Sequence, residues 1–215
     1  MSPKRPLWWP VPRIAPLLLC IACASGGNDP YKAGQPAVDI APGRSGPVSG
    51  VGIGGKDIMA MTDLMARDLL ATPTIAGRSV APRIIVDSAY FVNESSQPIN
   101  KNLITDRLRV GLNRASQGRM AFVGRENAAM VEQERELKRS GTTDVGTTGL
   151  TRAQAGVDFR LTGRINSLDS RSTQTGVIQR YNQISFEMVD LESGIIVWSG
   201  IYEFERAAAD DVVYR

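Results

Sequence analysis

The chain has 215 residues, of which 42% are hydrophobic and 22% are charged, a balance that predicts one ordinary domain with additional tails. Its formal net charge of +3 comes from Lys4, Arg5 and Arg13, because the first 22 residues contain no acid and the remainder holds 22 basic against 22 acidic residues. This balance argues against a nucleic-acid surface, which needs a clustered basic excess. The absence of histidine excludes Ser-His and Cys-His catalysis and most zinc sites.

The N-terminus is typical of a bacterial export signal. Its basic residues accompany a nine-residue apolar stretch, 14–22, which is shorter than the about 20 residues that span a bilayer but suits a secretory signal. Ala22 directly before Cys23 resembles the lipobox of bacterial lipoproteins, although Cys20 stands where that pattern usually has leucine. We therefore expect cleavage before Cys23 and lipidation of this residue, with an ordinary signal peptide cut near Ala24 as the alternative.

Lipidation would leave Cys23 as the only cysteine of the mature chain, so that no disulfide partner is orphaned. Several acyl chains, such as palmitate, would hold the protein firmly, because more than one chain makes membrane attachment stable. Ala24 follows the cysteine, whereas the usual signal for retention in the inner membrane is aspartate at that position. The sequence therefore predicts a lipoprotein anchored in the outer membrane and facing the periplasm.

The composition divides the chain into a signal peptide at 1–22, a lipidated cysteine with a flexible linker at 23–54, a globular domain at 55–206 and a tail at 207–215. The linker assignment rests on residues 24–50, because 13 of these 27 residues are Gly, Pro or Ser and no apolar period runs through them. Fully extended, they would span roughly 90 Å at about 3.3 Å each, whereas a flexible coil of this length averages about 29 Å.

A glycine-rich segment before the domain resembles a phosphate-binding loop. Gly50, Gly55 and Lys56 have the spacing of GxxxxGK, and residues 84–87 could form the acidic strand that accompanies it. Three features oppose this interpretation: Asp57 replaces the Ser or Thr that holds magnesium, no apolar strand precedes the loop, and an export signal directs the chain to where ATP is scarce. We therefore interpret the segment as a glycine hinge that leads into an N-cap at Asp57.

Apolar residues at helical spacing predict a helix that begins at Asp57 and ends near Pro73. Residues 83–92 predict a central strand, because apolar side chains occur on both of its faces. A polar loop at 93–100 is followed by a second amphipathic helix and by a short strand at 120–123. The apolar positions are Ile58, Met61, Met65 and Leu69 in the first helix and Leu103, Ile104, Leu108, Leu112 and Ala115 in the second.

Downstream, the sequence predicts a charged helix at 126–139 whose charges form a solvated face, a flexible loop at 141–149, and a short helix that Thr151 caps. A half-exposed strand begins at Phe159, where apolar and polar residues alternate, and a polar loop at 169–176 follows it.

A β-hairpin at 182–204 is the strongest local signal. Two β-branched and aromatic runs flank Glu192–Gly194, whose glycine suits the left-handed conformation of such a loop. Pairing Leu191 with Ile195 sets a register with one apolar face and one half-polar face, and the ring of Phe186 is expected to cover the bare backbone of its partner glycine. The expected pairs are Met188–Trp198, Phe186–Gly200, Ile184–Tyr202 and Asn182–Phe204 on the apolar face, and Val189–Val197, Glu187–Ser199 and Gln183–Glu203 on the other.

The order of elements is helix, strand, helix, strand, helix and then three strands in a meander. This order predicts an α+β fold in which a mixed sheet of four to five strands has its helices packed mainly on one face and ends in an antiparallel meander.

Three segments, 83–88, 104–123 and 191–200, resemble the LpoB family, outer-membrane lipoproteins that activate bifunctional class A penicillin-binding proteins. The resemblance implies a non-catalytic, monomeric activator of such a peptidoglycan synthase, with no cofactor, metal or nucleic acid and with contact to the membrane only through its lipid. It carries over no partner-binding residue. Well-known members have a long Pro-rich linker, whereas the linker here is short.

The same hairpin is similar to related periplasmic domains of the TolB N-terminal and curli-secretion types. A subunit or accessory of an outer-membrane secretion or assembly complex is therefore the alternative function. An enzyme acting on the cell wall would have to use carboxylates alone. Asp87, Asp158 and Asp190 are the candidates, but they lie in mid-strand, at a strand start and beside a turn, where structural roles are common, so we expect no enzyme.

Overall fold

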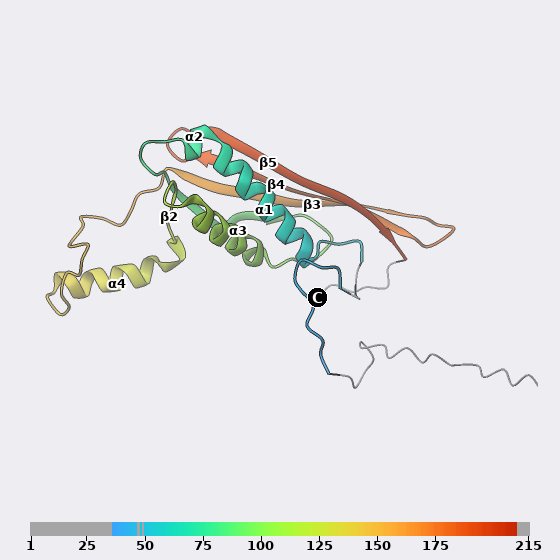
Figure 1. Ribbon diagram of the computed structural model, residues 1–215, viewed down its shortest axis with the longest axis horizontal. Helices are drawn as coiled ribbons and strands as arrows, with labels where there is room; N and C mark the ends of the chain where they lie inside the picture. The colour runs from blue at the N-terminus through green and yellow to red at the C-terminus, as the bar shows by residue number, and fades with distance from the viewer. Residues whose placement is uncertain (1–35, 47, 49, 210–215) are drawn as a thin grey trace, which may run out of the picture. The chain divides into compact units, whose positions relative to one another are not determined.

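Five strands form one mixed sheet in the order β2-β1-β3-β4-β5 (Figure 1). β1 (Arg83–Asn93) pairs in parallel with both β2 (Ala121–Phe122) and β3 (Phe159–Arg171). β4 (Ile178–Asp190) and β5 (Ile196–Ala208) continue from β3 as an antiparallel meander. The α+β fold, the mixed sheet and the C-terminal meander expected from the sequence are confirmed.

The computed structural model describes residues 36–46, 48 and 50–209. Cys23 and the expected cleavage site before it lie outside these residues. Val51 and Ile53 are buried in the folded unit, and β5 continues to Ala208. The ordered domain thus takes in residues on both sides of the expected span of 55–206.

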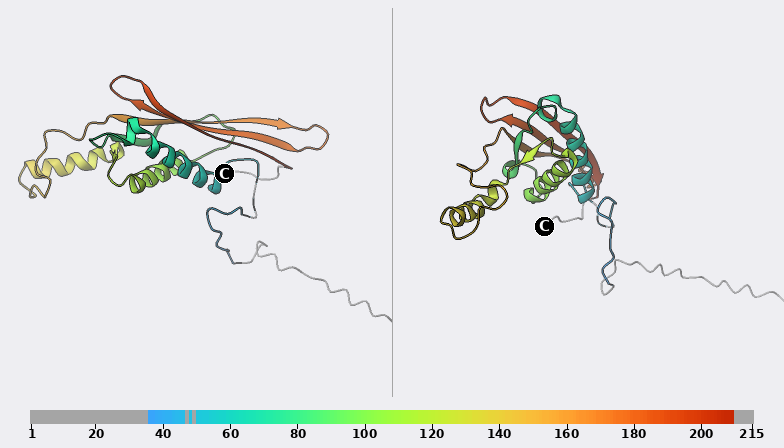
Figure 2. Two further views of the ribbon diagram at one scale, coloured as in Figure 1. Left: turned by 45° about the horizontal axis from the view of Figure 1, so that its top comes forward. Right: turned by 60° about the vertical axis from the view of Figure 1, so that its left-hand side comes forward.

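The helices that cover the sheet lie on one of its faces (Figure 2). α1 (Gly55–Ala71) and α3 (Lys101–Ser116) pack against each other, and the short α2 (Pro73–Ala76) follows α1 after Thr72, because proline suits the first turn of a helix. The predicted apolar stripe of α1 is buried, and so are the central residues of the α3 stripe, although Leu103 and Ala115 at its two ends are exposed. The buried set comprises Ile58, Met61, Met65, Leu69, Ile104, Leu108 and Leu112.

The N-terminus of α1 differs from the expectation in one residue. The N-cap is Gly54, and Asp57 lies three residues into the helix, where its carboxylate accepts a hydrogen bond from the Gly54 backbone N–H at 2.8 Å. An acidic side chain in the first turn satisfies a helical N–H and is favoured by the helix dipole. The N-cap predicted at Asp57 was therefore wrong, although the residue does stabilise the start of the helix.

The apolar pairs of the hairpin are confirmed between Asn182 and Met188 on β4 and their partners on β5. The predicted pairing of Val189 with Val197 was wrong: Val189 lies opposite Ile196, because β5 has one extra residue that forms a bulge. The predicted pairing of Leu191 with Ile195 was also wrong, because the Asp190 backbone N–H donates to the Ile195 carbonyl at 2.9 Å. The connecting loop is accordingly longer than expected, with Gly194 at a φ of +74°.

Two glycines in the sheet leave room for aromatic rings. A side chain at Gly163 would collide with the ring of Phe91, which stacks on Phe186 with ring centroids 5.4 Å apart. At Gly200 the nearest atoms belong to the Trp198 ring and to the sulfur of Met65. The expected cover of Gly200 by Phe186 is thus provided by Trp198, and Phe186 packs over the neighbouring strand instead.

The region between β2 and β3 forms an arm. It consists of the short helix η1 (Arg125–Asn127), α4 (Ala128–Arg139) and the return segment 140–157, which contains no helix where one capped by Thr151 was expected. Arg135 donates hydrogen bonds to the hydroxyl and carbonyl of Thr151, at 2.9 and 3.2 Å, which bind this segment to α4. No residue of α4 is buried, and among the described elements it packs appreciably only against η1.

Candidate partner-binding surface

Since α1 and α3 cover one face of the sheet, none of the helices described by the structure covers the other face. Side chains that alternate with the core residues point to this outer face. One row across four strands consists of Val92, Arg164, Ser185 and Ile201, which are aligned by the strand register. Val92 and Ile201 are exposed, so that apolar and charged groups lie side by side on the outer face.

A large bulge in β1 shapes one end of the outer face. Val86 lies opposite Leu161 and Phe91 lies opposite Gly163. The chain of β1 therefore advances five residues between two paired positions that are only two residues apart on β3. The Asp87 carboxylate accepts a hydrogen bond from the Ala89 backbone N–H at 3.1 Å within the bulge. Bulges redirect side chains and are frequent beside functional sites. Here the bulge leaves Tyr90 58% exposed.

Tyr90 is held in place by Arg160 of β3. The Arg160 guanidinium lies 4.6 Å from the centroid of the tyrosine ring, and one of its nitrogens lies 3.5 Å from the Asp87 carboxylate. Arg164 donates hydrogen bonds to both carboxylate oxygens of Glu94, at 3.0 and 3.1 Å. Tyrosine and arginine dominate the energetics of protein interfaces. We call the surface formed by Tyr90, Val92, Arg160, Arg164 and Ile201 the Tyr90 patch.

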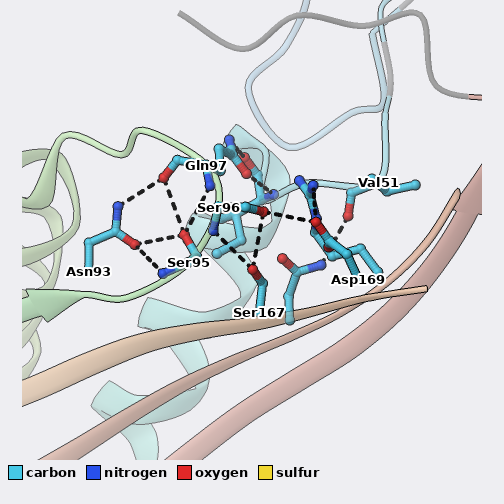
Figure 3. A network of polar contacts seen from close by, with 10 residues as sticks. Val51, Asn93, Ser95, Ser96, Gln97, Ser167 and Asp169 are labelled. Carbon is cyan, nitrogen blue, oxygen red and sulfur yellow. Dashed lines mark hydrogen bonds and ion pairs between the residues drawn. The ribbon is translucent and has the colours of Figure 1, made fainter. Parts of the chain in front are cut away.

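A second polar cluster lies on the helix-covered side of the sheet, at the far end of β3 and β4 (Figure 3). Ser96 donates a hydrogen bond to Asp169 at 3.1 Å, and its backbone N–H donates one to the Ser167 hydroxyl at 3.1 Å. Arg180 binds Asp169 through two guanidinium nitrogens, and its hydrogen bonds, together with that from Ser96, hold the pKa of Asp169 below its ordinary value. β3 continues to Arg171, so the first residues of the polar loop expected at 169–176 belong to the strand, and the loop itself lies between Arg171 and Ile178, where β4 begins.

The three carboxylates considered for catalysis have structural partners. Asp158 accepts a hydrogen bond from the Arg83 backbone N–H at 2.7 Å, and Asp87 lies in the bulge beside Arg160. Asp190 accepts hydrogen bonds from the backbone N–H and hydroxyl of Ser193 and from the backbone of the preceding residue, and these bonds lower its pKa. Each carboxylate therefore stabilises a local turn, a bulge or a strand end.

The glycine-rich segment leads into a helix N-terminus that already holds an anion. Asp57 forms a two-pronged ion pair with Arg206 of β5, with contacts of 2.6 and 2.9 Å. Its carboxylate therefore lies where a phosphate-binding loop would present backbone N–H groups to a phosphate, which opposes the phosphate-binding interpretation. The expected glycine hinge was wrong, because Val51 and Ile53 are buried in the folded unit. Within the described part of the chain, no group of His, Cys, Asp and Glu residues could hold a metal ion.

The carboxylates and glycines singled out in the sequence thus do not form a site, and the Tyr90 patch was missed. In the sequence, residues 83–92 continue as one strand-like run with no Gly or Pro to mark the bulge that displays Tyr90.

None of the helices that the structure describes has both the length and the apolar character needed to cross a bilayer.

The profile of a family described as peptidoglycan-synthase activator LpoB matches residues 57–204. Among solved structures, the chain is similar to the LpoB C-terminal domain from Salmonella enterica, at 20% identity and a TM-score of 0.38, over 66% of this chain and 94% of that one. It is similar to the LpoB C-terminal domain from Escherichia coli at 17% identity and a TM-score of 0.40, over 69% and 97%. Lipoprotein GNA1162 from Neisseria meningitidis matches at 20% identity and a TM-score of 0.31, over 61% and 87%. No curated protein matches the chain.

Proposed function

Because the chain belongs to the LpoB family of peptidoglycan-synthase activators, we propose that it binds a bifunctional class A penicillin-binding protein and stimulates its synthesis of peptidoglycan. The observation that carries this proposal is the extent of the family match, which runs from the first turn of α1 to the middle of β5. The structural partners of Asp87, Asp158 and Asp190 support a non-catalytic role. The family match does not favour the alternative of a secretion or assembly complex.

The protein would reach its partner from the outer membrane. We propose that the export signal is removed before Cys23, that this cysteine is lipidated, and that the domain acts as a monomer in the periplasm. Replacement by Cys23→Ser should then release the protein into the soluble periplasmic fraction. If the variant still fractionates with the outer membrane, the anchor lies elsewhere.

The Tyr90 patch is the surface that we propose for the synthase. Its support is chemical: an exposed tyrosine is braced by an arginine, and exposed apolar residues, Val92 and Ile201, accompany the charged Arg164. A ring already fixed by its neighbours loses little side-chain entropy on binding. A synthase surface that presents an apolar patch and hydrogen-bond acceptors for the arginine side chains would be complementary to the Tyr90 patch.

The function is tested with a soluble form of the mature chain that carries Cys23→Ser. This protein should bind a class A synthase of its own organism and increase its rate of glycan polymerisation several-fold, measured with labelled lipid-linked precursor. The same synthase without the protein is the control. Absence of both binding and stimulation for every class A synthase of the organism would contradict the proposal.

The surface is tested separately with Tyr90→Ala. Loss of an interface hot spot costs about 2 kcal/mol or more, which corresponds to an about 30-fold weaker Kd. The matched control is Leu168→Ala, which truncates a side chain that is also exposed on the outer face but lies outside the Tyr90 patch. Both variants should melt like the parent protein. Equal affinity of Tyr90→Ala and Leu168→Ala would place the synthase on another surface.

A further inference from the structure

The segment just before α1 is buried although it belongs to no helix or strand. Val51 has no exposed side-chain area and Ile53 is 5% exposed. Residues in such irregular segments must find partners for their backbone groups outside a regular ladder, because a buried unpaired N–H or C=O destabilises the fold. The partners found here come from distant parts of the chain.

Side chains bind the backbone of four consecutive residues, 51–54. Asn182 of β4 donates to the Val51 carbonyl at 2.9 Å, and Arg206 of β5 donates to the Gly52 carbonyl at 2.9 Å. The side-chain amide of Gln97 pairs with both polar groups of Ile53, accepting from its N–H at 2.7 Å and donating to its carbonyl at 3.0 Å. The Gly54 N–H binds Asp57, as described above.

The side chains that bind residues 51–54 are themselves braced. Arg206 is fixed by its ion pair with Asp57, and Asn182 is buried on the helix-covered side of the sheet. The loop that carries Gln97 is tied by Ser96 to Ser167 and Asp169 of β3, as Figure 3 shows. A displacement of residues 51–54 would therefore have to break bonds to β4, β5, the 94–100 loop and α1.

We propose that residues 51–54 are a tension clamp, which transfers a pull on the N-terminal segment directly to the sheet. This inference rests on the proposed function only for the source of the pull, a short linker held at the outer membrane while the domain holds a synthase. Without the clamp, force would enter at the first turn of α1 and peel the helix from the core. With the clamp, several hydrogen bonds must break and two buried side chains must leave the core together before the force acts on α1.

The test is a pulling experiment on the purified Cys23→Ser protein, so that neither lipid nor synthase is involved. One handle is attached through Ser193→Cys in the β4–β5 loop, and the other through Ser25→Cys, upstream of the clamp. In a second geometry the upstream handle is attached through Lys56→Cys, an exposed position past the clamp. When the protein is pulled through Ser25→Cys at constant force, Gln97→Ala should raise the rate at which α1 is released about tenfold or more. When it is pulled through Lys56→Cys, the same substitution should raise this rate distinctly less. An equal change in both geometries would make Gln97 an ordinary contributor to stability and overturn the clamp.

Hydrogen exchange of the unaltered protein gives a second readout that does not depend on how the variant folds. The Ile53 amide should exchange at least about 100-fold more slowly than in an unstructured peptide, and no faster than the amides in the middle of α1. Exchange of Ile53 at the rate of a frayed terminus would contradict the proposal. Failure of the protein to stimulate a synthase would leave both measurements unaffected.

Discussion

At the scale of single residues, Trp198 links the hairpin to the helical layer. Its ring lies over Gly200, and its indole N–H donates a hydrogen bond to Asp68 of α1 at 2.7 Å. Trp198→Ala should lower the free energy of unfolding by about 3–5 kcal/mol, as large aromatic truncations in cores do. Trp198→Phe keeps much of the ring and loses the hydrogen bond, which contributes about 1 kcal/mol. Urea melts of both variants check this, and an unchanged midpoint for the alanine variant would contradict the packing.

A second residue, Asp169, makes stability depend on pH. Because Arg180 and Ser96 lower its pKa in the folded state, its contribution is present above the unfolded pKa of about 3.9 and is lost as pH falls through the folded value. The stability difference between the parent protein and Asp169→Asn should stay constant from pH 7 to about 5 and shrink below about 4. Denaturant melts at each pH measure it. A difference that grows on acidification would have the wrong sign for this ion pair.

At the scale of elements, the β4–β5 hairpin could be predicted and the β1 bulge could not. Strict alternation of buried and exposed residues fixes a hairpin register, because a slip of one residue would turn the apolar row outward. The bulge follows from a match between distant strands, in which Phe91 must reach Gly163 to stack on Phe186. The contacts of residues 51–54 could not be predicted from the sequence either, because Asn182 binds the Val51 carbonyl from 131 residues away.

The stacking of Phe91 on Phe186 predicts the effect of a methyl group at Gly163. Gly163→Ala would force the Phe91 ring out of its place, and overpacking of this kind typically lowers stability by about 1–3 kcal/mol. Thermal melts measure the loss. The double variant Gly163→Ala with Phe91→Leu should lose less than the sum of its two single variants, because the smaller side chain removes the collision. Strict additivity would show that the two residues do not compete for space.

At the scale of the whole molecule, the reach of the linker is expected to limit activity in the cell. Deleting residues 25–34 would shorten the taut span from roughly 90 Å to roughly 56 Å, while leaving the buried Val51 and Ile53 in place. Stimulation by purified protein should be unchanged, and stimulation in cells should be lost. Growth that depends on the activated synthase measures the effect, and a harmless deletion would show that reach does not limit activity. Purified fragments should begin before Val51, because a start at Gly55 removes part of the core.

The arm formed by η1, α4 and residues 140–157 offers a place to attach a reporter. Residues 141–148 are all exposed, and no residue of α4 is buried, so an added fluorescent domain would displace nothing from the core. Exposed loop tips of this kind accept insertions most readily. A fusion at residue 145 would leave both the linker expected at 23–54 and the Tyr90 patch unaltered. The protein could then be followed by microscopy in a growing cell, and the proposed function predicts that it gathers where new wall is made.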